Sequence, residues 1–215
     1  MNPAQAVVEW AGFELSPAQV DQLERYAEWL ADEAIPAGGL GPREAPRIWE
    51  RHIADSLTFA AGWKGQEAPH ELLDLGSGVG LPGIPLAIAW PECRVTMLDR
   101  AGRRTRLILR AIRVLNLENA VVAQGDAFDV ADEWHGVVAR AAVKPPEFVG
   151  LCSKLLDDIG VGVIALSTKP ERPERVDDLI NIASGLGLDA DLVRIPQDAL
   201  DASPWLLIMQ RRGDA

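Results

Sequence analysis

From residue 71 onward, short apolar runs alternate with stretches whose apolar residues recur at helical spacing. This alternation is typical of β-α-β units in an α/β fold, where helices cover both faces of a mostly parallel, doubly wound sheet. We expect seven strands, near residues 71–75, 94–98, 119–123, 135–140, 161–166, 190–195 and 204–211. We expect helices near residues 82–90, 101–115, 145–156 and 172–186. Only a loop precedes the last strand, so that strand should run antiparallel at or near an edge of the sheet.

The chain before this sheet predicts helices only. Residues 16–34 begin with Ser16, a suitable N-cap, followed by Pro17 at the first helical position. Residues 47–63 predict a second helix, after a loop rich in proline and glycine at 35–46. We therefore divide the chain into an N-terminal helical extension, 1–66, and an α/β domain, 67–215.

The net charge of −11 argues against a protein that coats itself with nucleic acid, because phosphate binding depends on Lys and Arg. One basic cluster stands out against that charge. It consists of Arg100, Arg103, Arg104, Arg106, Arg110 and Arg113. Several of these arginines share one helical face, which fits either an RNA-facing stripe or an ordinary solvated surface.

Two cysteines, Cys93 and Cys152, lie far apart without any CxxC pair, so we expect buried thiols rather than a disulfide or a metal site. No apolar run reaches the length of a membrane span, and the N-terminus lacks the pattern of a signal peptide. We expect a cytoplasmic protein that binds neither a metal nor a membrane.

The segment DLGSGVGLPGIP, residues 74–85, follows the first predicted strand directly. Its glycines at 76, 78 and 80 allow a sharp turn and a close approach of the backbone to a ligand. A dinucleotide fingerprint would place glycine where Leu81 stands, and a P-loop would continue with Gly-Lys-Ser/Thr. The loop therefore favours a ligand that is neither a dinucleotide nor a nucleoside triphosphate.

Aspartates stand at the ends of the first three predicted strands: Asp74, Asp99 and Asp126. Ligands of open α/β sheets bind at the carboxyl ends of the strands, where a carboxylate such as Asp99 can accept hydrogen bonds from ribose hydroxyls. Asp126 occupies the equivalent place for an adenine contact. The alternative is that each aspartate only caps the helix that follows it.

The D-x-G-x-G-x-G arrangement, with an acid ending the second strand, resembles class I S-adenosyl-L-methionine-dependent methyltransferases. Three segments narrow the resemblance: RHIADSL at 51–57, the stretch from Leu72 to Val122 and GVVARA at 136–141. Together they resemble the small-subunit (16S) ribosomal RNA guanine-N7 methyltransferases once named glucose-inhibited division protein B. GLPGIP is the most distinctive part, and GLGPREAPRIWERH is similar to the form of the family found in high-GC Gram-positive bacteria.

The resemblance implies S-adenosyl-L-methionine as cofactor, and 16S ribosomal RNA or the assembling small ribosomal subunit as partner. With the glycine loop and the strand-end acids, it gives as cofactor-binding residues Asp74, Gly76, Ser77, Gly78, Gly80, Leu81, Asp99, Arg100, Asp126, Ala127, Phe128 and Arg140. It gives as catalytic residues Arg140, Arg51 and His52. Taken without the resemblance, RHIADS would be a plain helix with Arg51 paired to Asp55 at i, i+4 spacing.

Three positions depart from the family pattern, and two of them lose or move a positive charge; the third is Ala139, where the family has a serine. Ser167 stands where the family has a lysine, with Lys169 two residues on, and Asp126 replaces an arginine. Two other functions therefore stay open: methylation of a small molecule, and a non-catalytic protein that binds adenosylmethionine. Guanine N7 carries a lone pair and no proton, so methyl transfer to it needs alignment rather than a general base.

Overall fold

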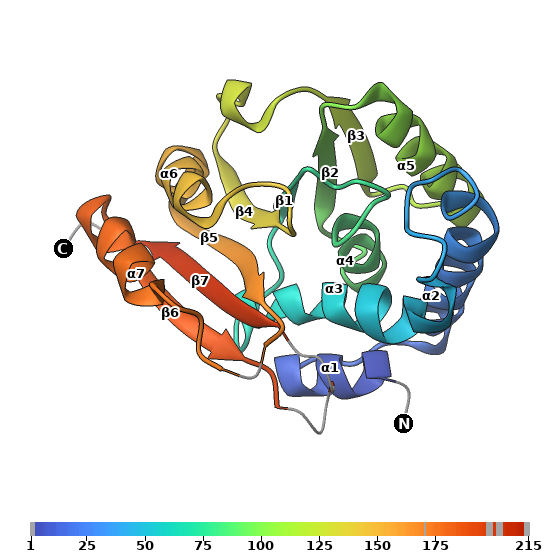
Figure 1. Cartoon of the computed structure of the whole chain (residues 1–215), viewed down its shortest axis with the longest axis horizontal. Helices are drawn as coiled ribbons and strands as arrows, with labels where there is room; N and C mark the ends of the chain where they lie inside the picture. The colour runs from blue at the N-terminus through green and yellow to red at the C-terminus, as the bar shows by residue number, and fades with distance from the viewer. Residues whose placement is uncertain (1–2, 170, 197–199, 201–203, 213–215) are drawn as a thin grey trace.

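The computed structural model describes residues 3–169, 171–196, 200 and 204–212, and within them the strands form one seven-stranded sheet with the order β3-β2-β1-β4-β5-β7-β6 (Figure 1). The strands are β1 (Glu71–Leu75), β2 (Arg94–Asp99), β3 (Ala120–Gln124), β4 (Trp134–Ala139), β5 (Leu156–Ser167), β6 (Leu188–Arg194) and β7 (Trp205–Arg211). Strands β1 to β5 pair in parallel, and β7 runs antiparallel between β5 and β6. The predicted α/β class and the antiparallel last strand near an edge are both confirmed.

The strand order reverses beside β1, which pairs with β2 on one side and with β4 on the other. At such a switch point the connections leave in opposite directions and open a crevice at the carboxyl ends of the strands. β1 ends at Leu75, immediately before the glycine loop, and β4 ends at Ala139, immediately before Arg140. The topology therefore brings these two segments to the same place.

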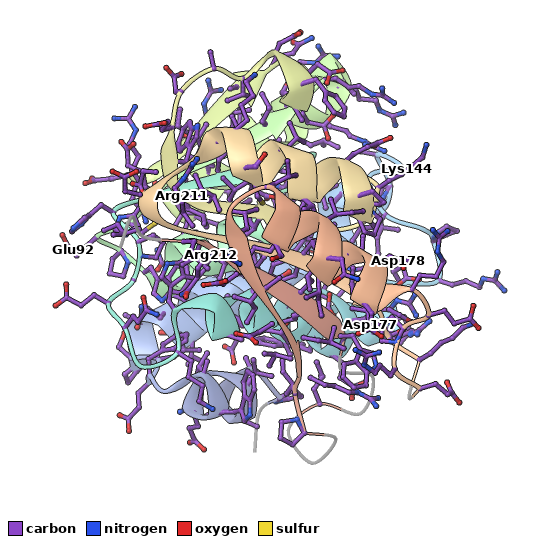
Figure 2. The ribbon with its side chains drawn as sticks, turned by 90° about the vertical axis from the view of Figure 1, so that its left-hand side faces the viewer. Glu92, Lys144, Asp177, Asp178, Arg211 and Arg212 are labelled. Carbon is purple, nitrogen blue, oxygen red and sulfur yellow. The ribbon has the colours of Figure 1, made fainter. Side chains whose placement is uncertain are left out.

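Helices cover both faces of the sheet (Figure 1). One face packs against α1 (Pro3–Ala11), α2 (Pro17–Trp29), α4 (Gly83–Ala89) and α5 (Gly102–Leu115). The other face packs against α6 (Pro145–Leu155) and α7 (Val176–Gly185), which lie together in Figure 2. α7 begins at Val176 rather than near residue 172, because Pro173 precedes it and Arg175 adopts a left-handed φ of 59°.

The N-terminal extension is helical as expected, with two differences. Ser16 caps α2 through a reciprocal capping box with Gln19, and the helix passes into a π-helical turn, η1 (Leu30–Ala34). Sequence analysis named no helix at Pro3–Ala11, where α1 lies.

The single regular helix predicted at 47–63 is wrong. The chain there forms a 3-10 turn η2 (Ala45–Arg47), a π-helical stretch η3 (Trp49–Ala54), a short α3 (Asp55–Leu57) and a 3-10 stretch η4 (Thr58–Trp63). All residues from Ser56 to Trp63 are buried, and a Cβ on Gly62 would lie only 2.6 Å from Val163 of β5. Packing against the sheet therefore sets the local pitch here in place of helix propensity.

The buried side chains of the extension belong to the same hydrophobic core as β1, β2, α4 and α5. Cys93 and Cys152 are buried free thiols, as expected, and burial raises the pKa of Cys93 to about 12. Among the described residues, no helix combines the length and the apolar character needed to cross a membrane. The division at residue 66 stays a prediction.

Candidate functional site

The glycine loop is the first wall of a pocket at the carboxyl end of β1. Gly76, Gly78 and Gly80 have φ values of 71°, 64° and 101°, a region that L side chains rarely adopt. A Cβ on Gly76 would collide with Ala142, and one on Gly80 would collide with Ile84. A Cβ on Gly78 would meet nothing within 4 Å. Gly78 is therefore the glycine whose backbone faces open space, where a ligand can approach.

Two buried carboxylates support this loop from behind. Asp74 Oδ2 accepts a hydrogen bond from Gly83 N at 2.9 Å, and burial raises the pKa of Asp74 to about 7. Asp99 Oδ2 accepts from Gly78 N at 3.0 Å, and its Oδ1 accepts from Ala101 N at 2.9 Å. Both side chains thus tie the loop to the helices that follow it.

Asp126 accepts a hydrogen bond from Phe128 N at 3.1 Å and caps the short 3-10 turn η5 (Ala127–Asp129). Each of the three strand-end aspartates therefore bonds a backbone N–H at or near the start of the next helical turn, as the capping alternative predicts. A carboxylate has about four acceptor positions, so capping leaves room for a ligand hydroxyl. Their role in cofactor binding stays a prediction.

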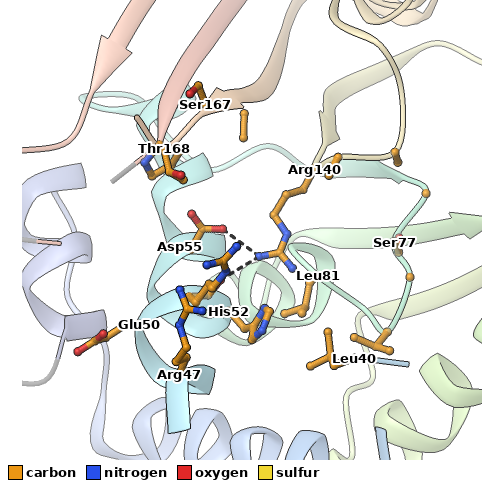
Figure 3. A pocket seen from close by; sticks show the side chains of 18 of the residues that line it. Leu40, Arg47, Glu50, His52, Asp55, Ser77, Leu81, Arg140, Ser167 and Thr168 are labelled. Carbon is orange, nitrogen blue, oxygen red and sulfur yellow. Dashed lines mark hydrogen bonds and ion pairs between the residues drawn. The ribbon is translucent and has the colours of Figure 1, made fainter. Parts of the chain in front are cut away.

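The second wall is helical and is built from side chains. Arg140 follows β4 and extends across the pocket, where its Nη1 donates to Asp55 Oδ2 at 2.9 Å and to the carbonyl oxygen of Arg51 at 3.3 Å (Figure 3). Arg51 does not pair with Asp55; its Nε lies 3.8 Å from Glu44 Oε2. The i, i+4 pair expected of a plain helix is therefore replaced by a long-range pair with Arg140.

His52 lies in the same wall with only 7% of its surface exposed. Its Nε2 is 3.0 Å from Glu44 Oε2. Burial, with a further contribution from the Arg140 charge, lowers the pKa of His52 to about 4. The imidazole is therefore neutral at neutral pH, and Nε2 carries the proton that it donates to Glu44.

The two walls enclose a cavity of about 660 Å³, within the range of small-molecule sites. Of the predicted residues, those that line it are Gly76, Ser77, Gly78, Leu81, Arg51, His52 and Arg140. Asp74, Gly80 and Asp99 are buried and do not line the cavity, and the exposed or partly exposed residues Arg100, Asp126, Ala127 and Phe128 do not line it either. Phe128 is 55% exposed at the neighbouring strand end.

Several residues that line the cavity were not predicted from the sequence, among them Arg47, Glu50 and Thr168. Lys169 also lines the cavity, next to Ser167 (Figure 3 labels Ser167 and Thr168). A cation is therefore present near the position where the family's lysine is replaced by serine. No local pattern marks these residues, because the fold gathers them from η2, η3 and the end of β5.

The described lining of the cavity carries more cations than acids although the chain is acidic. Its described lining includes the cations Arg47, Arg51, Arg104, Arg140 and Lys169, against the acids Glu50 and Asp55. Of the arginine cluster at 100–113, only Arg104 belongs to this described lining, where its Nη1 lies 3.5 Å from Asp99 Oδ2, and Arg110 is paired with Glu33 at 2.6 Å. Such a cavity favours an anionic partner locally.

Three features of the site suit an adenosine-containing cofactor. Gly78 leaves open space beside the loop backbone, Leu81 offers apolar surface, and Asp99 provides a carboxylate at the end of β2. The sheet order, the glycine loop and this strand-end acid define the class I fold of S-adenosyl-L-methionine-dependent methyltransferases.

Solved structures show the same fold. Precorrin-6y C5,15-methyltransferase from Geobacter metallireducens aligns with a TM-score of 0.53 at 12% identity, over 72% of this chain and 87% of that one. Fibrillarin from Aeropyrum pernix, solved with natively bound S-adenosyl-L-methionine, aligns with a TM-score of 0.51 at 20% identity, over 65% of this chain and 66% of that one.

The chain belongs to the rRNA small subunit methyltransferase G family, whose model matches residues 19–179. The ribosomal RNA small subunit methyltransferase G of Thermobifida fusca is 35% identical over 202 residues, covering 93% of this chain and 81% of the relative. That of Photorhabdus laumondii is 30% identical over 212 residues, covering 98% of each chain. The family resemblance expected from GLPGIP and RHIADSL is confirmed.

Proposed function

We propose that this protein transfers the methyl group of S-adenosyl-L-methionine to N7 of a guanine in 16S ribosomal RNA. The observation that carries the proposal is the pairing of two unlike walls around one cavity. The glycine wall exposes backbone at Gly78 beside a strand-end acid, as an adenosine-containing cofactor requires. The opposite wall presents Arg47, Arg51 and Arg140, as an anionic nucleic acid requires.

The cofactor would lie against Gly76, Gly78 and Leu81, with Asp99 at its ribose, and it supplies a methyl group on a cationic sulfur. Asp126, Ala127 and Phe128 lie at the neighbouring strand end, where the adenine of such a ligand would reach. Asp74, Gly80 and Arg100 do not line the cavity. The proposed contribution of Asp74 is its hydrogen bond to Gly83 N, and that of Gly80 is its positive φ within the loop, while Arg100 directly follows Asp99 at the end of β2.

The chain's own residues need only align the target base, because N7 presents a free lone pair. Neutral His52 is not required to accept a proton, and its hydrogen bond to Glu44 fixes the orientation of its ring. Arg140 extends into the cavity with Nε and Nη2 without a partner among the described residues, so it can donate to a base or phosphate oxygen. Catalysis then depends on proximity and orientation.

The substrate form that we propose is the assembling small subunit or its free RNA, in the cytoplasm. The excess of cations over acids among the described lining residues supports an RNA partner in spite of the net charge of −11. Lys169 supports it as well, because it retains a cation beside Ser167.

The test uses labelled S-adenosyl-L-methionine with purified 16S RNA and with small subunits from cells that lack this gene. We expect label in the RNA at a single guanine, and strand cleavage by the borohydride and aniline treatment that detects N7-methylguanine. Label in small molecules but not in RNA would support the small-molecule alternative. Cofactor binding without any transfer would support the non-catalytic alternative.

A further inference from the structure

The ion pair between Arg140 and Asp55 joins two parts of the pocket that are 85 residues apart in the sequence. The Arg140 side chain is 18% exposed and the Asp55 side chain 14% exposed, so the pair is mostly buried. Figure 3 shows Arg140 reaching from its loop to Asp55 on the helical wall, with a dashed line between the two side chains. Arg140 Nη1 also donates to the carbonyl oxygen of Arg51. A buried pair of this kind fixes a guanidinium far more firmly than a solvated one.

The backbone around Arg140 is constrained as well. Ala141 has a φ of 56°, a left-handed conformation that is uncommon for alanine. Ala142 packs against Gly76 so closely that no Cβ fits on that glycine. The turn at 140–142 therefore contacts the glycine wall through the Ala142 Cβ and the helical wall through the Arg140 side chain. A non-glycine residue in such a conformation is often found where function depends on geometry.

We propose that Asp55 is a positioning residue for methyl transfer, which holds Arg140 across the pocket so that Nε and Nη2 face the substrate base. The inference rests on the proposed function and adds to it a residue that touches Arg140 rather than the reacting atoms. Guanine carries O6 beside N7, and arginine is the usual donor to that edge. Only Nη1 of Arg140 is used by Asp55 and Arg51, so the other nitrogens remain available for O6.

Asp55 also balances charge at the centre of the pocket. Methyl transfer would form a bond from the N7 lone pair to the methyl carbon and break the carbon–sulfur bond, whose electron pair stays on the sulfur. One positive charge would thus move from the sulfur to the base, and no proton leaves. An unbalanced Arg140 cation would oppose the arrival of this charge. The Asp55 carboxylate, 2.9 Å from Nη1, offsets it.

The experiment measures steady-state methylation of small subunits or 16S RNA by the full chain and by Asp55→Asn. We expect kcat to fall about 10- to 100-fold, the loss typical of one hydrogen bond to a charged group. Affinity for S-adenosyl-L-methionine, measured by calorimetry, should change less than about threefold, because Asp55 does not contact the cofactor in this proposal. The matched control is Asp189→Asn, which breaks an exposed Asp–Arg pair with Arg212 at the far sheet edge (Figure 2 labels Arg212) and should keep wild-type kcat.

A double variant separates positioning from an independent role. Arg140→Met should lose activity, and Asp55→Asn/Arg140→Met should lose no more than Arg140→Met alone, because Asp55 then has nothing to hold. If Asp55→Asn alone does not fold, the double variant can still be compared with Arg140→Met, because removing both charges leaves no unpaired charge in the protein interior. A folded Asp55→Asn with wild-type kcat, or losses that multiply in the double variant, would overturn the inference. A wild-type protein that methylates no RNA would instead overturn the proposed function.

Discussion

The two walls of the pocket are stabilised by different kinds of hydrogen bond. In the glycine wall, the contacts that fix the loop end on the backbone: Asp74 holds Gly83 N, and Asp99 holds Gly78 N and Ala101 N. In the helical wall, side chains bond to one another, as in Glu44–His52 and Arg140–Asp55. A backbone surface suits a ligand of constant structure, whereas a side-chain surface can be adjusted to a particular substrate. We therefore assign the first wall to the cofactor and the second to the RNA.

The largest expected effect is on the glycine wall. Gly78→Val should reduce affinity for S-adenosyl-L-methionine at least about 1000-fold, or about 4 kcal/mol, because the new side chain fills the open space at the loop. The matched control is Gly65→Val, since Gly65 also has a positive φ, 79°, and nothing within 4 Å of its Cβ position. Both variants should lose stability to a similar extent, and Gly65→Val should bind the cofactor normally. Calorimetry measures the cofactor affinity of both variants. Equal affinities would refute the assignment of the glycine loop to cofactor binding.

Burial of Asp74 predicts an effect of pH on stability. The pKa of Asp74 rises from 3.8 to about 7 on folding, so the folded state holds its proton more tightly than the unfolded state. The stability that this group contributes is present at low pH and is lost as pH rises from about 4 through 7. As the pH rises from 5 to 8, the wild type should therefore lose about 3 kcal/mol of unfolding free energy that Asp74→Asn does not lose.

Urea unfolding of both proteins at the two pH values, without cofactor, measures this difference. His52 titrates in the same range with the opposite sign, because its lowered pKa makes stability rise with pH between about 4 and 6.5. The His52 contribution is common to the wild type and Asp74→Asn, so it cancels in the comparison. A difference in stability that does not change with pH would contradict the assignment of a raised pKa to Asp74.

Asp99→Ala should weaken cofactor binding by about 2 kcal/mol, since it removes a charged acceptor and leaves Gly78 N and Ala101 N without their partner. The matched control is Asp157→Ala, which removes a carboxylate that accepts from Ile159 N at 3.1 Å near the start of β5, outside the cavity lining. Calorimetric titration compares the two variants. A loss of cofactor affinity no greater in Asp99→Ala than in Asp157→Ala would mean that Asp99 acts only as a helix cap.

The smallest effect is expected on the helical wall. Arg47→Ala should weaken RNA binding by less than about tenfold and reduce the salt slope of binding by about 1, as the loss of one phosphate contact does. Its cofactor affinity should stay that of the wild type. Arg94→Ala is the control, because Arg94 is an exposed arginine at the opposite end of β2. Filter binding over a series of salt concentrations measures the salt slope of RNA binding for each protein. Equal slopes for Arg47→Ala and the wild type would show that Arg47 makes no contact with an RNA phosphate.

The same contrast explains which parts of the site the sequence predicts. The glycine loop is encoded locally: the end of β1, Asp74 and the three glycines follow one another in the chain, and the glycines set the turn through their positive φ values. Sequence analysis therefore placed the loop glycines beside a ligand, and the family resemblance added Leu81; Gly76, Gly78 and Leu81 do line the pocket. The helical wall depends on partners far away in the chain. Sequence analysis named Arg51, His52 and Arg140 through family resemblance, but it could not give their contacts.

By itself, the sequence determined the alternation of strands and helices, the turn after β1 and the family, because periodicity and glycine positions act over a few residues. Only the tertiary structure decided that 47–63 breaks into π-helical, α and 3-10 segments, since packing against β5 outweighs local propensity there. It also decided that Asp55 pairs with Arg140 rather than with Arg51. An ion pair forms where burial and geometry are best, and the fold sets both.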